Sequence, residues 1–205
     1  MHPNPTPPSP PSPNLTPVTH THCPHCGTPY PTSATTSWPR TCPSCQETTY
    51  RNPLPVAVAL LPVHATTTTP TTTTTSTTSA APTPSTGLLV ITRTIEPQNG
   101  ALALPGGFID HAEDWRNAVV RELREETGIE AHAADVQLAD ALSSPTDHLL
   151  LFGLLPAVEE SELPPSVPTA ETAGWQVLYA PTELAFPLHT QAARAWFAGT
   201  YTRRP

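Results

Sequence analysis

The sequence predicts an α/β fold in which helices pack against a mixed β-sheet, and two observations lead to this prediction. Short apolar runs with β-branched residues, which are typical of buried strands, alternate along the chain with segments of helical periodicity. These strands occur on either side of two predicted helices, an order that favours a mixed α/β sandwich. The 205 residues suffice for one full domain and a small additional module.

The first half of this domain is predicted to be β-rich. Residues 56–63 and 87–94 are apolar and read as buried strands. The residues between them, about 64–86, are almost entirely Thr, Ser, Pro and Ala, so we expect a disordered Thr/Pro-rich insertion in a hairpin. A short strand is expected over residues 101–108, broken by a turn at Pro105-Gly106-Gly107.

A helix is predicted from about Ala112 to Thr127. Asp110 and Glu113 resemble a capping box at its start, and Gly128 is a natural left-handed residue at its end. The elements expected after it are strands over 136–142, 147–155 and 175–179, an acidic loop over 158–171, a short turn over 182–184 and a closing helix over 189–197.

The composition limits the classes of partner. The net charge is −8, the nine basic residues are all Arg, and such a chain matches a nucleic-acid backbone poorly, so we expect no nucleic-acid partner. A small anionic substrate remains compatible if metal ions screen its charge. The start of the chain lacks the pattern of a signal peptide, and the longest apolar run, 56–63, is too short to span a bilayer. We therefore expect a cytoplasmic protein without a membrane partner.

Four cysteines predict a small metal module. They form two C-x-x-C pairs separated by fifteen residues, a spacing that fits a four-thiolate zinc site; the predicted ligands are Cys23, Cys26, Cys42 and Cys45. Four thiolates leave no open position, so this zinc would be structural. The alternatives are iron in a rubredoxin-like site, disulfides or free thiols, and substitution by one of His20, His22 and His25. We expect a disordered Pro-rich tail over residues 1–18, a zinc ribbon over 19–50 and the main domain over 51–200.

The predicted helix carries three glutamates on one face. Glu122, Glu125 and Glu126 are neighbours at spacings of three and four residues, and Arg121 can relieve only part of their repulsion. Hard divalent cations such as Mg²⁺ or Mn²⁺ prefer such oxygen ligands and would neutralise the cluster. The glycines at 106–107 would let the backbone, including a carbonyl, approach the same site. The alternative is a plain solvated acidic face.

The spacing of the surrounding residues narrows this choice. This part of the chain resembles the Nudix box at every fixed position. The matching pattern is Gly107, five residues, Glu113, seven residues, then Arg121-Glu122-Leu123-x-Glu125-Glu126-x-Gly128-Ile129. The flanking Leu104-Pro105-Gly106-Gly107-Phe108 is also similar to this family. The resemblance implies a Nudix α/β/α sandwich and hydrolysis of a nucleoside diphosphate linked to another moiety, with Mg²⁺ or Mn²⁺ as cofactor.

The resemblance also implies roles for individual residues. The implied metal ligands are the carbonyl of Gly106 and the carboxylates of Glu113, Glu122, Glu125 and Glu126. Arg121 matches the arginine that orients them, and Arg121, Glu122 and Glu125 are the implied catalytic residues of the helix. The general base varies within the family and is either a glutamate of the box or one from a later loop. The later candidates are Glu159, Glu160, Glu162 and Glu171, of which we favour Glu171.

The substrate is less well determined by the sequence. Phe108 and Trp175 are the aromatic residues that we expect to contact the substrate, with Trp115, Tyr179 and Phe186 as further candidates for stacking. His189 is either a phosphate contact or an ordinary residue at a helix start.

The cysteine module adds a second resemblance. With the linker Tyr50-Arg51-Asn52-Pro53, it resembles the zinc ribbon of NADH pyrophosphatases, and it would be structural or mediate contacts with a partner or within a homodimer. The Ser-Gln-Pro-Trp-Pro-Phe-Pro signature of those enzymes is replaced here by residues 142–147, which argues against NADH. Pro145, sixteen residues after Ile129, resembles the ADP-ribose pyrophosphatases and favours ADP-ribose or a nucleotide sugar. The alternatives are a nucleotide-sensing, catalytically weak Nudix-like module, and a zinc-dependent scaffold with a vestigial site.

Overall fold

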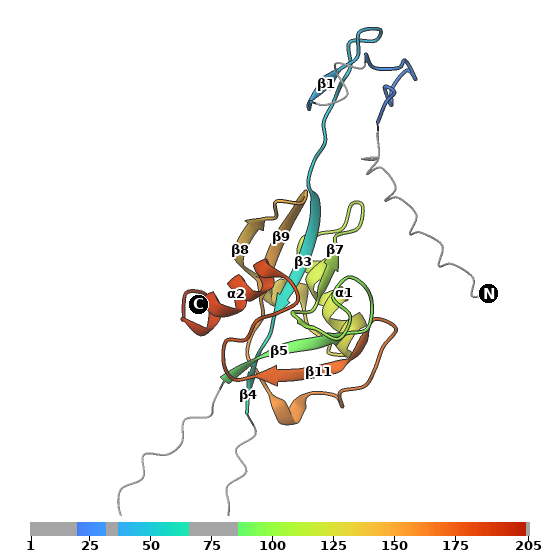
Figure 1. The fold of residues 1–205 in the computed structure, drawn as a ribbon. Helices are drawn as coiled ribbons and strands as arrows, with labels where there is room; N and C mark the ends of the chain where they lie inside the picture. The colour runs from blue at the N-terminus through green and yellow to red at the C-terminus, as the bar shows by residue number, and fades with distance from the viewer. Residues whose placement is uncertain (1–19, 32–36, 66–85, 204–205) are drawn as a thin grey trace, which may run out of the picture. The chain divides into compact units, whose positions relative to one another are not determined.

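A computed structural model describes residues 20–31, 37–65 and 86–203 (Figure 1). The chain divides into two compact units, Met1–Asn52 and Pro53–Pro205. The predicted tail at 1–18 lies outside the described residues, as does all but the ends of the predicted insertion at 64–86. No helix in the described part of the chain is long and apolar enough to cross a membrane.

The first unit is built around a short hairpin and a very small core. Strands β1 (Arg40–Thr41) and β2 (Thr48–Thr49) pair antiparallel. Among the described residues of this unit, the buried apolar ones are Cys23, Tyr30 and Cys42. Arg40 is also buried, because its guanidinium stacks over the Trp38 ring at 4.0 Å and donates to the carbonyl of His20 at 2.6 Å. A core of this size is too small to hold a domain together without a metal or a covalent link.

The second unit contains two mixed sheets. The five-stranded sheet has the order β10 (Val158–Glu159), β4 (Pro62–His64), β5 (Thr86–Arg93), β11 (Thr172–Leu178), with β6 (Leu102–Ala103) also paired to β5. The four-stranded sheet has the order β7 (Gly106–Phe108), β3 (Leu54–Leu60), β9 (His148–Leu154), β8 (Gln137–Ser143). Strands β3 and β9 run parallel at the centre of the second sheet, while β7 and β8 form its antiparallel edges.

The strand predicted over residues 56–63 is in fact two strands, one in each sheet. The carbonyl of Leu60 accepts from Leu155, and the carbonyl of Leu61 accepts from Leu89 in the other sheet, each at 3.0 Å. Pro62 follows directly as the first residue of β4, a position where its missing N–H costs no ladder bond. The backbone therefore passes from one sheet to the other at Leu61.

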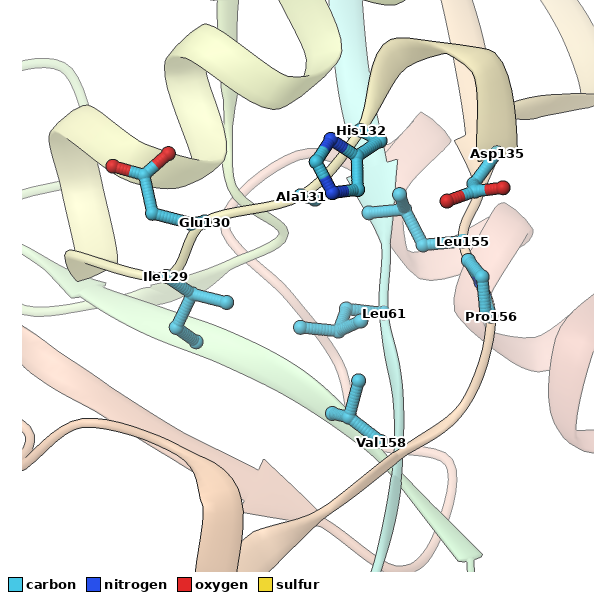
Figure 2. Close-up of a pocket in the computed structure, with 9 residues that line it drawn as sticks. All are labelled: Leu61, Ile129, Glu130, Ala131, His132, Asp135, Leu155, Pro156 and Val158. Carbon is cyan, nitrogen blue, oxygen red and sulfur yellow. The ribbon is translucent and has the colours of Figure 1, made fainter.

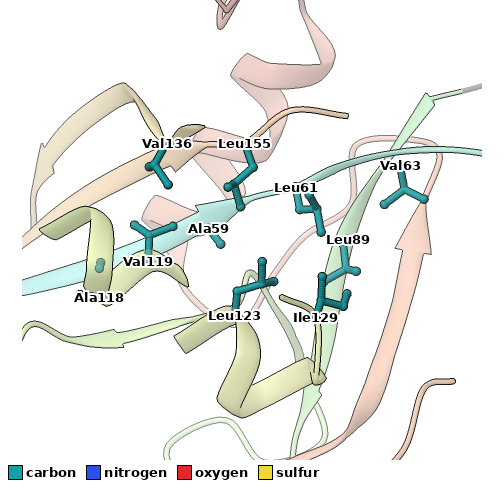
Figure 3. Close-up of a cluster of buried hydrophobic side chains, with 11 residues drawn as sticks. Ala59, Leu61, Val63, Leu89, Ala118, Val119, Leu123, Ile129, Val136 and Leu155 are labelled. Atoms are coloured by element: carbon teal, nitrogen blue, oxygen red, sulfur yellow. The ribbon is translucent and has the colours of Figure 1, made fainter. Parts of the chain in front are cut away.

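Helices α1 (Trp115–Thr127) and α2 (Pro187–Phe197) pack on opposite faces of β3. Alternate residues of a strand point to opposite faces. Ala57 and Ala59 belong to a buried cluster with Val119 and Leu123 of α1, the cluster drawn in Figure 3. Val58, Leu60 and Phe152 belong to a second cluster, which includes Ala192 and Ala193 of α2. This arrangement confirms the predicted α/β/α sandwich.

Helix α1 begins at Trp115 rather than at Ala112. Ala112 has a φ of 63°, which is incompatible with a right-handed helix. Asp114 caps the helix by accepting from the backbone of Arg116 at 2.8 Å. The predicted pair of Asp110 and Glu113 does form reciprocal hydrogen bonds, but in a turn before the helix. Gly128 ends the helix in the left-handed conformation, as predicted.

Four further parts of the chain differ from the prediction. The strand expected over 101–108 is split between β6 and β7 in different sheets, and Gly106 and Gly107 lie in β7 rather than in a turn. The loop expected over 158–171 contains β10 and a 3₁₀ helix, η3 (Glu160–Glu162). A second 3₁₀ helix, η2 (Ala133–Asp135), precedes β8, and β11 begins before the predicted residue 175.

Replacing Leu123 by alanine should destabilise the second unit strongly. Leu123 is fully buried between α1 and the sheets, so the substitution leaves a cavity and should lower the free energy of unfolding by about 2–5 kcal/mol. Denaturant unfolding monitored by tryptophan fluorescence measures this change. Leu138→Ala, at a position that is 55% exposed, is the control and should change the free energy of unfolding by less than about 0.5 kcal/mol. Equal effects of the two substitutions would contradict the assigned core.

Candidate active site

Strand β7 packs closely against helix α1 at Gly107 and against strand β3 at Gly106, because neither residue has a side chain. A Cβ at Gly107 would collide with the carboxylate of Glu122, whose Cδ would be only 2.6 Å away. A Cβ at Gly106 would run into the backbone of Ala57 and Val58. Neither glycine has a left-handed φ, so close packing, and not backbone conformation, requires glycine at both positions. The predicted close approach of backbone and carboxylates is therefore present, although from a strand.

Arg121 connects the carboxylates of the site. Its Nε and Nη2 each donate to one oxygen of Glu113 at 2.9 Å. Its Nη1 donates to Glu122 at 2.6 Å and to Glu125 at 3.2 Å, and Nη2 also donates to the carbonyl of Phe108 at 2.9 Å. The planar guanidinium thus fixes three carboxylates and strand β7 at once. The hydrogen bonds from Arg121 hold the pKa of Glu113 below its usual range.

Glu126 is the most buried carboxylate of the group, with 4% of its surface exposed. The N–H of Gly106 donates to its Oε2 at 2.9 Å. Burial raises the pKa of Glu126 to about 8, and the nearby charges of Glu122 and Glu171 add to this effect. Burial also raises the pKa of Glu122, against the opposing effect of Arg121. Two neighbouring carboxylates are thus held where their charged forms are unfavourable, which is the condition that a bound cation would relieve.

Glu171 lies near this group, at the start of β11. Its charge raises the pKa of both Glu122 and Glu126. Its carbonyl accepts from Thr94 at 2.8 Å, and the hydroxyl of the next residue, Thr172, donates to the carbonyl of Glu126 at 2.9 Å. These bonds fix its backbone against β5 and α1. The other candidate bases, Glu159, Glu160 and Glu162, lie on β10 and η3.

The two predicted substrate contacts differ in their surroundings. Phe108 is 56% exposed, and its ring centroid lies 5.9 Å from that of His148. The neighbouring Gly107 faces helix α1 and Glu122, so the side chain of Phe108 lies on the opposite face of the sheet. Trp175 is partly buried against the cluster beneath α1, and its indole N–H is buried without a hydrogen-bond partner among the described residues. Both assignments stay predictions.

The sequence interpretation missed Arg93 and left two roles open for His189, a phosphate contact or an ordinary residue at a helix start. Arg93, at the end of β5, stacks over the Phe186 ring at 5.1 Å, and its charge opposes the rise in the pKa of Glu126. It pairs in register with Thr172 across the sheet, a contact that no local pattern reveals. His189 is buried and accepts a hydrogen bond at Nδ1 from the N–H of Leu104 at 3.3 Å, so in this structure it contacts backbone and is not open to a phosphate.

A separate hollow of about 170 Å³ lies at the carboxyl ends of the parallel strands β3 and β9 (Figure 2). Its wall is mainly apolar, and Glu130, His132 and Asp135 contribute polar groups. The remaining lining residues are Leu61, Ile129, Ala131, Leu155, Pro156 and Val158. None of the predicted site residues lines it.

The four cysteines converge in the first unit. Their Sγ atoms all lie within 4.8 Å of one another, with 3.6 Å between Cys26 and Cys42 and 3.7 Å between Cys23 and Cys45. A tetrahedron with Zn–S bonds of about 2.3 Å has edges of about 3.8 Å, so these separations fit a four-thiolate zinc ion. They are far too long for disulfide bonds.

The two cysteine pairs are presented by similar turns. Gly27 donates to the carbonyl of Cys23 at 2.9 Å, and Gln46 donates to the carbonyl of Cys42 at 3.0 Å. Gly27 and Gln46 both have φ in the left-handed region. A hydrogen bond to the hydroxyl of Thr28 is the main cause that lowers the pKa of Cys26 to about 6, which favours the thiolate form that binds metal.

Comparison with known proteins identifies the family. The NUDIX domain model matches residues 73–199, which is more than half of the chain. The chain belongs to the Nudix family. The ADP-ribose pyrophosphatase of Methanocaldococcus jannaschii is 50% identical to this Nudix protein over 42 residues, which are 20% of this chain and 25% of that relative. The aligned part is therefore only a quarter of the relative's length.

Solved structures support the same fold. A NUDIX hydrolase from Nitrosomonas europaea is similar to this Nudix protein with a TM-score of 0.56 and 18% identity, over 87% of this chain and 91% of that one. The NUDIX domain of Shewanella oneidensis NrtR, complexed with ADP ribose, has a TM-score of 0.51 and 18% identity over 74% of this chain and 90% of that one. A MutT/nudix family protein from Enterococcus faecalis has a TM-score of 0.50 and 18% identity over 66% of this chain and 47% of that one. These matches confirm the predicted Nudix fold, while the resemblance of the ribbon to NADH pyrophosphatases stays a prediction.

The raised pKa of Glu126 should make the stability of the metal-free protein depend on pH. The folded state favours the protonated carboxyl, so this stabilisation is complete below the usual pKa of 4.5 and is lost as the pH rises towards about 8. Urea unfolding at a series of pH values, in buffers without Mg²⁺ or Mn²⁺, should show a midpoint that falls over this range. Glu126→Gln should flatten the dependence. The same slope in this variant and in the wild type would show that another group is responsible.

Proposed function

We propose that this Nudix protein hydrolyses a phosphoanhydride bond in a nucleoside diphosphate linked to another moiety, with Mg²⁺ or Mn²⁺ as cofactor. The observation that carries this proposal is the convergence of Glu122, Glu125, Glu126 and the backbone of Gly106, with burial opposing the negative charge of two of the glutamates. A purely structural acidic face would be solvated and would not retain carboxylates in this state.

We assign different roles to the metal ligands, Arg121 and Glu113. A cation would be held by Glu122, Glu125, Glu126 and the Gly106 carbonyl, and when bound it would stabilise negative charge on the diphosphate and activate a water molecule. Arg121 keeps the carboxylates in position through its hydrogen bonds. Both oxygens of Glu113 are bound by Arg121, so in this structure Glu113 positions the arginine, and its role as a metal ligand stays a prediction.

Two further groups complete the proposed chemistry. Glu171 is our proposed general base: it is exposed, its backbone is anchored, and its charge acts on Glu122 and Glu126, so it can accept a proton from the attacking water. Arg93 is stacked on Phe186, its charge lowers the pKa of Glu126, and it is our proposed cation for a substrate phosphate. Phe108 lies on the opposite face of the edge strand β7, and its exposed ring is the one that we propose for stacking on a base that extends around this edge.

ADP-ribose, or a nucleotide sugar of the same type, is the proposed substrate class. The name of the Methanocaldococcus jannaschii relative supports ADP-ribose through a local match. The spacing of Pro145 from Ile129 supports the same class, and the residues at 142–147 disfavour NADH.

Turnover on a substrate panel tests this function. Phosphate-containing products should appear with ADP-ribose or nucleotide sugars in the presence of Mg²⁺ or Mn²⁺, faster than with NADH, diadenosine polyphosphates or nucleoside triphosphates. Glu125→Gln removes one proposed ligand from an exposed position and should lower kcat by about 10³-fold or more without changing the unfolding midpoint. Glu130→Gln, an exposed acid just beyond the same helix, is the matched control and should retain full activity.

The panel also separates the competing functions. Binding of ADP-ribose without turnover of any substrate would identify a nucleotide sensor, and neither binding nor turnover would identify a scaffold. Retained activity of Glu125→Gln would refute the role assigned to that residue.

We also propose that Cys23, Cys26, Cys42 and Cys45 hold one structural zinc ion. Because the core of the first unit is so small, removing the zinc should unfold this unit. Metal analysis should find one zinc per chain, and a strong chelator should release it and expose four thiols to titration. Limited proteolysis should then cut within residues 20–52 while the second unit stays intact. Iron in the purified protein, or thiols that react fully before chelation, would contradict the proposal.

A further inference from the structure

We propose that His189 of α2 is a positioning residue for the metal site, because its imidazole holds the backbone of Leu104 and thereby the following Pro105-Gly106-Gly107 segment against helix α1. This inference deepens the proposed function and rests on it, since Gly106 and Glu126 are proposed to hold the cation. His189 itself would touch neither the cation nor the substrate.

The ring of His189 is held in one orientation. Its Nδ1 accepts the hydrogen bond from the N–H of Leu104 at 3.3 Å. The rings of Phe152 and Phe186 meet it edge-on, at centroid distances of 6.1 Å and 5.1 Å. Only 6% of the residue is exposed. A ring enclosed in this way can hold a backbone group in place more firmly than a mobile surface side chain.

The chemical state of the ring suits this role. A backbone N–H can only donate, so Nδ1 must be the unprotonated nitrogen and the ring proton must reside on Nε2. Burial lowers the pKa of His189 to about 3, so the neutral acceptor persists across the physiological range.

The segment from Leu104 to Gly106 is anchored residue by residue to three different elements. The N–H of Leu104 donates to His189 of α2, and the carbonyl of Pro105 accepts from Ala59 of β3 at 2.8 Å. The N–H of Gly106 then donates to Glu126 of α1 at 2.9 Å. Proline has no N–H, so the bond to His189 is the donor contact that precedes Gly106. Without it, the buried N–H of Leu104 would be unsatisfied, which favours movement of the segment.

The experiment compares two substitutions in adjacent residues of α2. His189→Leu removes the acceptor for the buried N–H of Leu104. Thr190→Val is the matched control: the Thr190 hydroxyl accepts from the N–H of Leu184 at 2.9 Å, so this substitution also leaves one buried backbone N–H unsatisfied, but not one of the segment from Leu104 to Gly106. His189→Asn retains an acceptor oxygen on a short side chain and serves as the conservative variant.

Two measurements follow the site itself. Hydrogen exchange of the Gly106 and Gly107 amides reports on the segment without any metal, and calorimetric titration with Mn²⁺ reports on the carboxylates without turnover. We expect His189→Leu to accelerate the exchange of these amides and to weaken Mn²⁺ binding by about 10-fold or more, as seen for outer partners of metal ligands. Thr190→Val should leave both within about twofold of the wild type after correction for the folded fraction, and His189→Asn should recover part of the loss.

The outcomes separate this inference from the proposed function. Wild-type exchange and Mn²⁺ affinity in His189→Leu, or equal losses in Thr190→Val, would overturn the positioning role. If the wild-type protein bound Mn²⁺ but hydrolysed no member of the substrate panel, the proposed function would fail, while accelerated exchange and weakened binding in His189→Leu would still support the positioning role. If His189→Leu did not fold, His189→Asn compared with Thr190→Val would decide by the same two measurements.

Discussion

The contact between β7 and α1 is the constraint on which the site depends. Because Gly107 has no side chain, the carboxylate of Glu122 occupies the space where a Cβ would stand. The same approach brings the N–H of Gly106 within hydrogen-bonding distance of Glu126. The carboxylates are thereby withdrawn from water beside a backbone rather than spread over a solvated helix surface. Desolvation then opposes their ionisation, and the pair can remain charged only with a compensating cation nearby.

Arg121 supplies part of that compensation, but none of its hydrogen bonds reaches Glu126. Its guanidinium is already committed to Glu113, Glu122, Glu125 and the carbonyl of Phe108. Glu126 receives no hydrogen bond from it and is reached by the backbone of Gly106 instead. The arginine therefore arranges the cluster without neutralising its most buried member. An isolated surface salt bridge would add little stability. The ion pairs that Arg121 shares among Glu113, Glu122 and Glu125 instead determine how these carboxylates are arranged.

The sequence was sufficient where the chemistry is carried by neighbouring residues. The residues from Gly107 to Ile129 are contiguous and form the end of β7, a turn and helix α1, so the predicted family, the α/β/α fold and the grouping of Glu122, Glu125 and Glu126 follow from local pattern. Arg93 and His189 could not be assigned in this way. Arg93 reaches the site through pairing of β5 with β11, and His189 does so by packing of α2 beneath Leu104.

The same reasoning explains the errors in the predicted elements. Residues 56–63 form one apolar run in the sequence, and the change of sheet at Leu61 is set by which partners the backbone meets, Leu155 on one side and Leu89 on the other. Residues 101–108 are predicted as a short strand broken by a turn at 105–107, whereas Leu104 and Pro105 connect strands of two different sheets. In both regions a proline marked the position of the break, but proline alone does not indicate that a second sheet receives the chain.

The pairing of β4 with β5 has a consequence for how this domain can vary. His64 and Thr86 face each other in register and their side chains are 2.9 Å apart, so the two ends of the segment between them lie side by side. In topological terms, residues 65–85 stand where a two-residue hairpin turn would suffice. The entropy of closing such a loop grows only with the logarithm of its length. Length at this point is therefore nearly neutral for the fold, and residues can be gained or lost there while the glutamates of α1 keep their geometry.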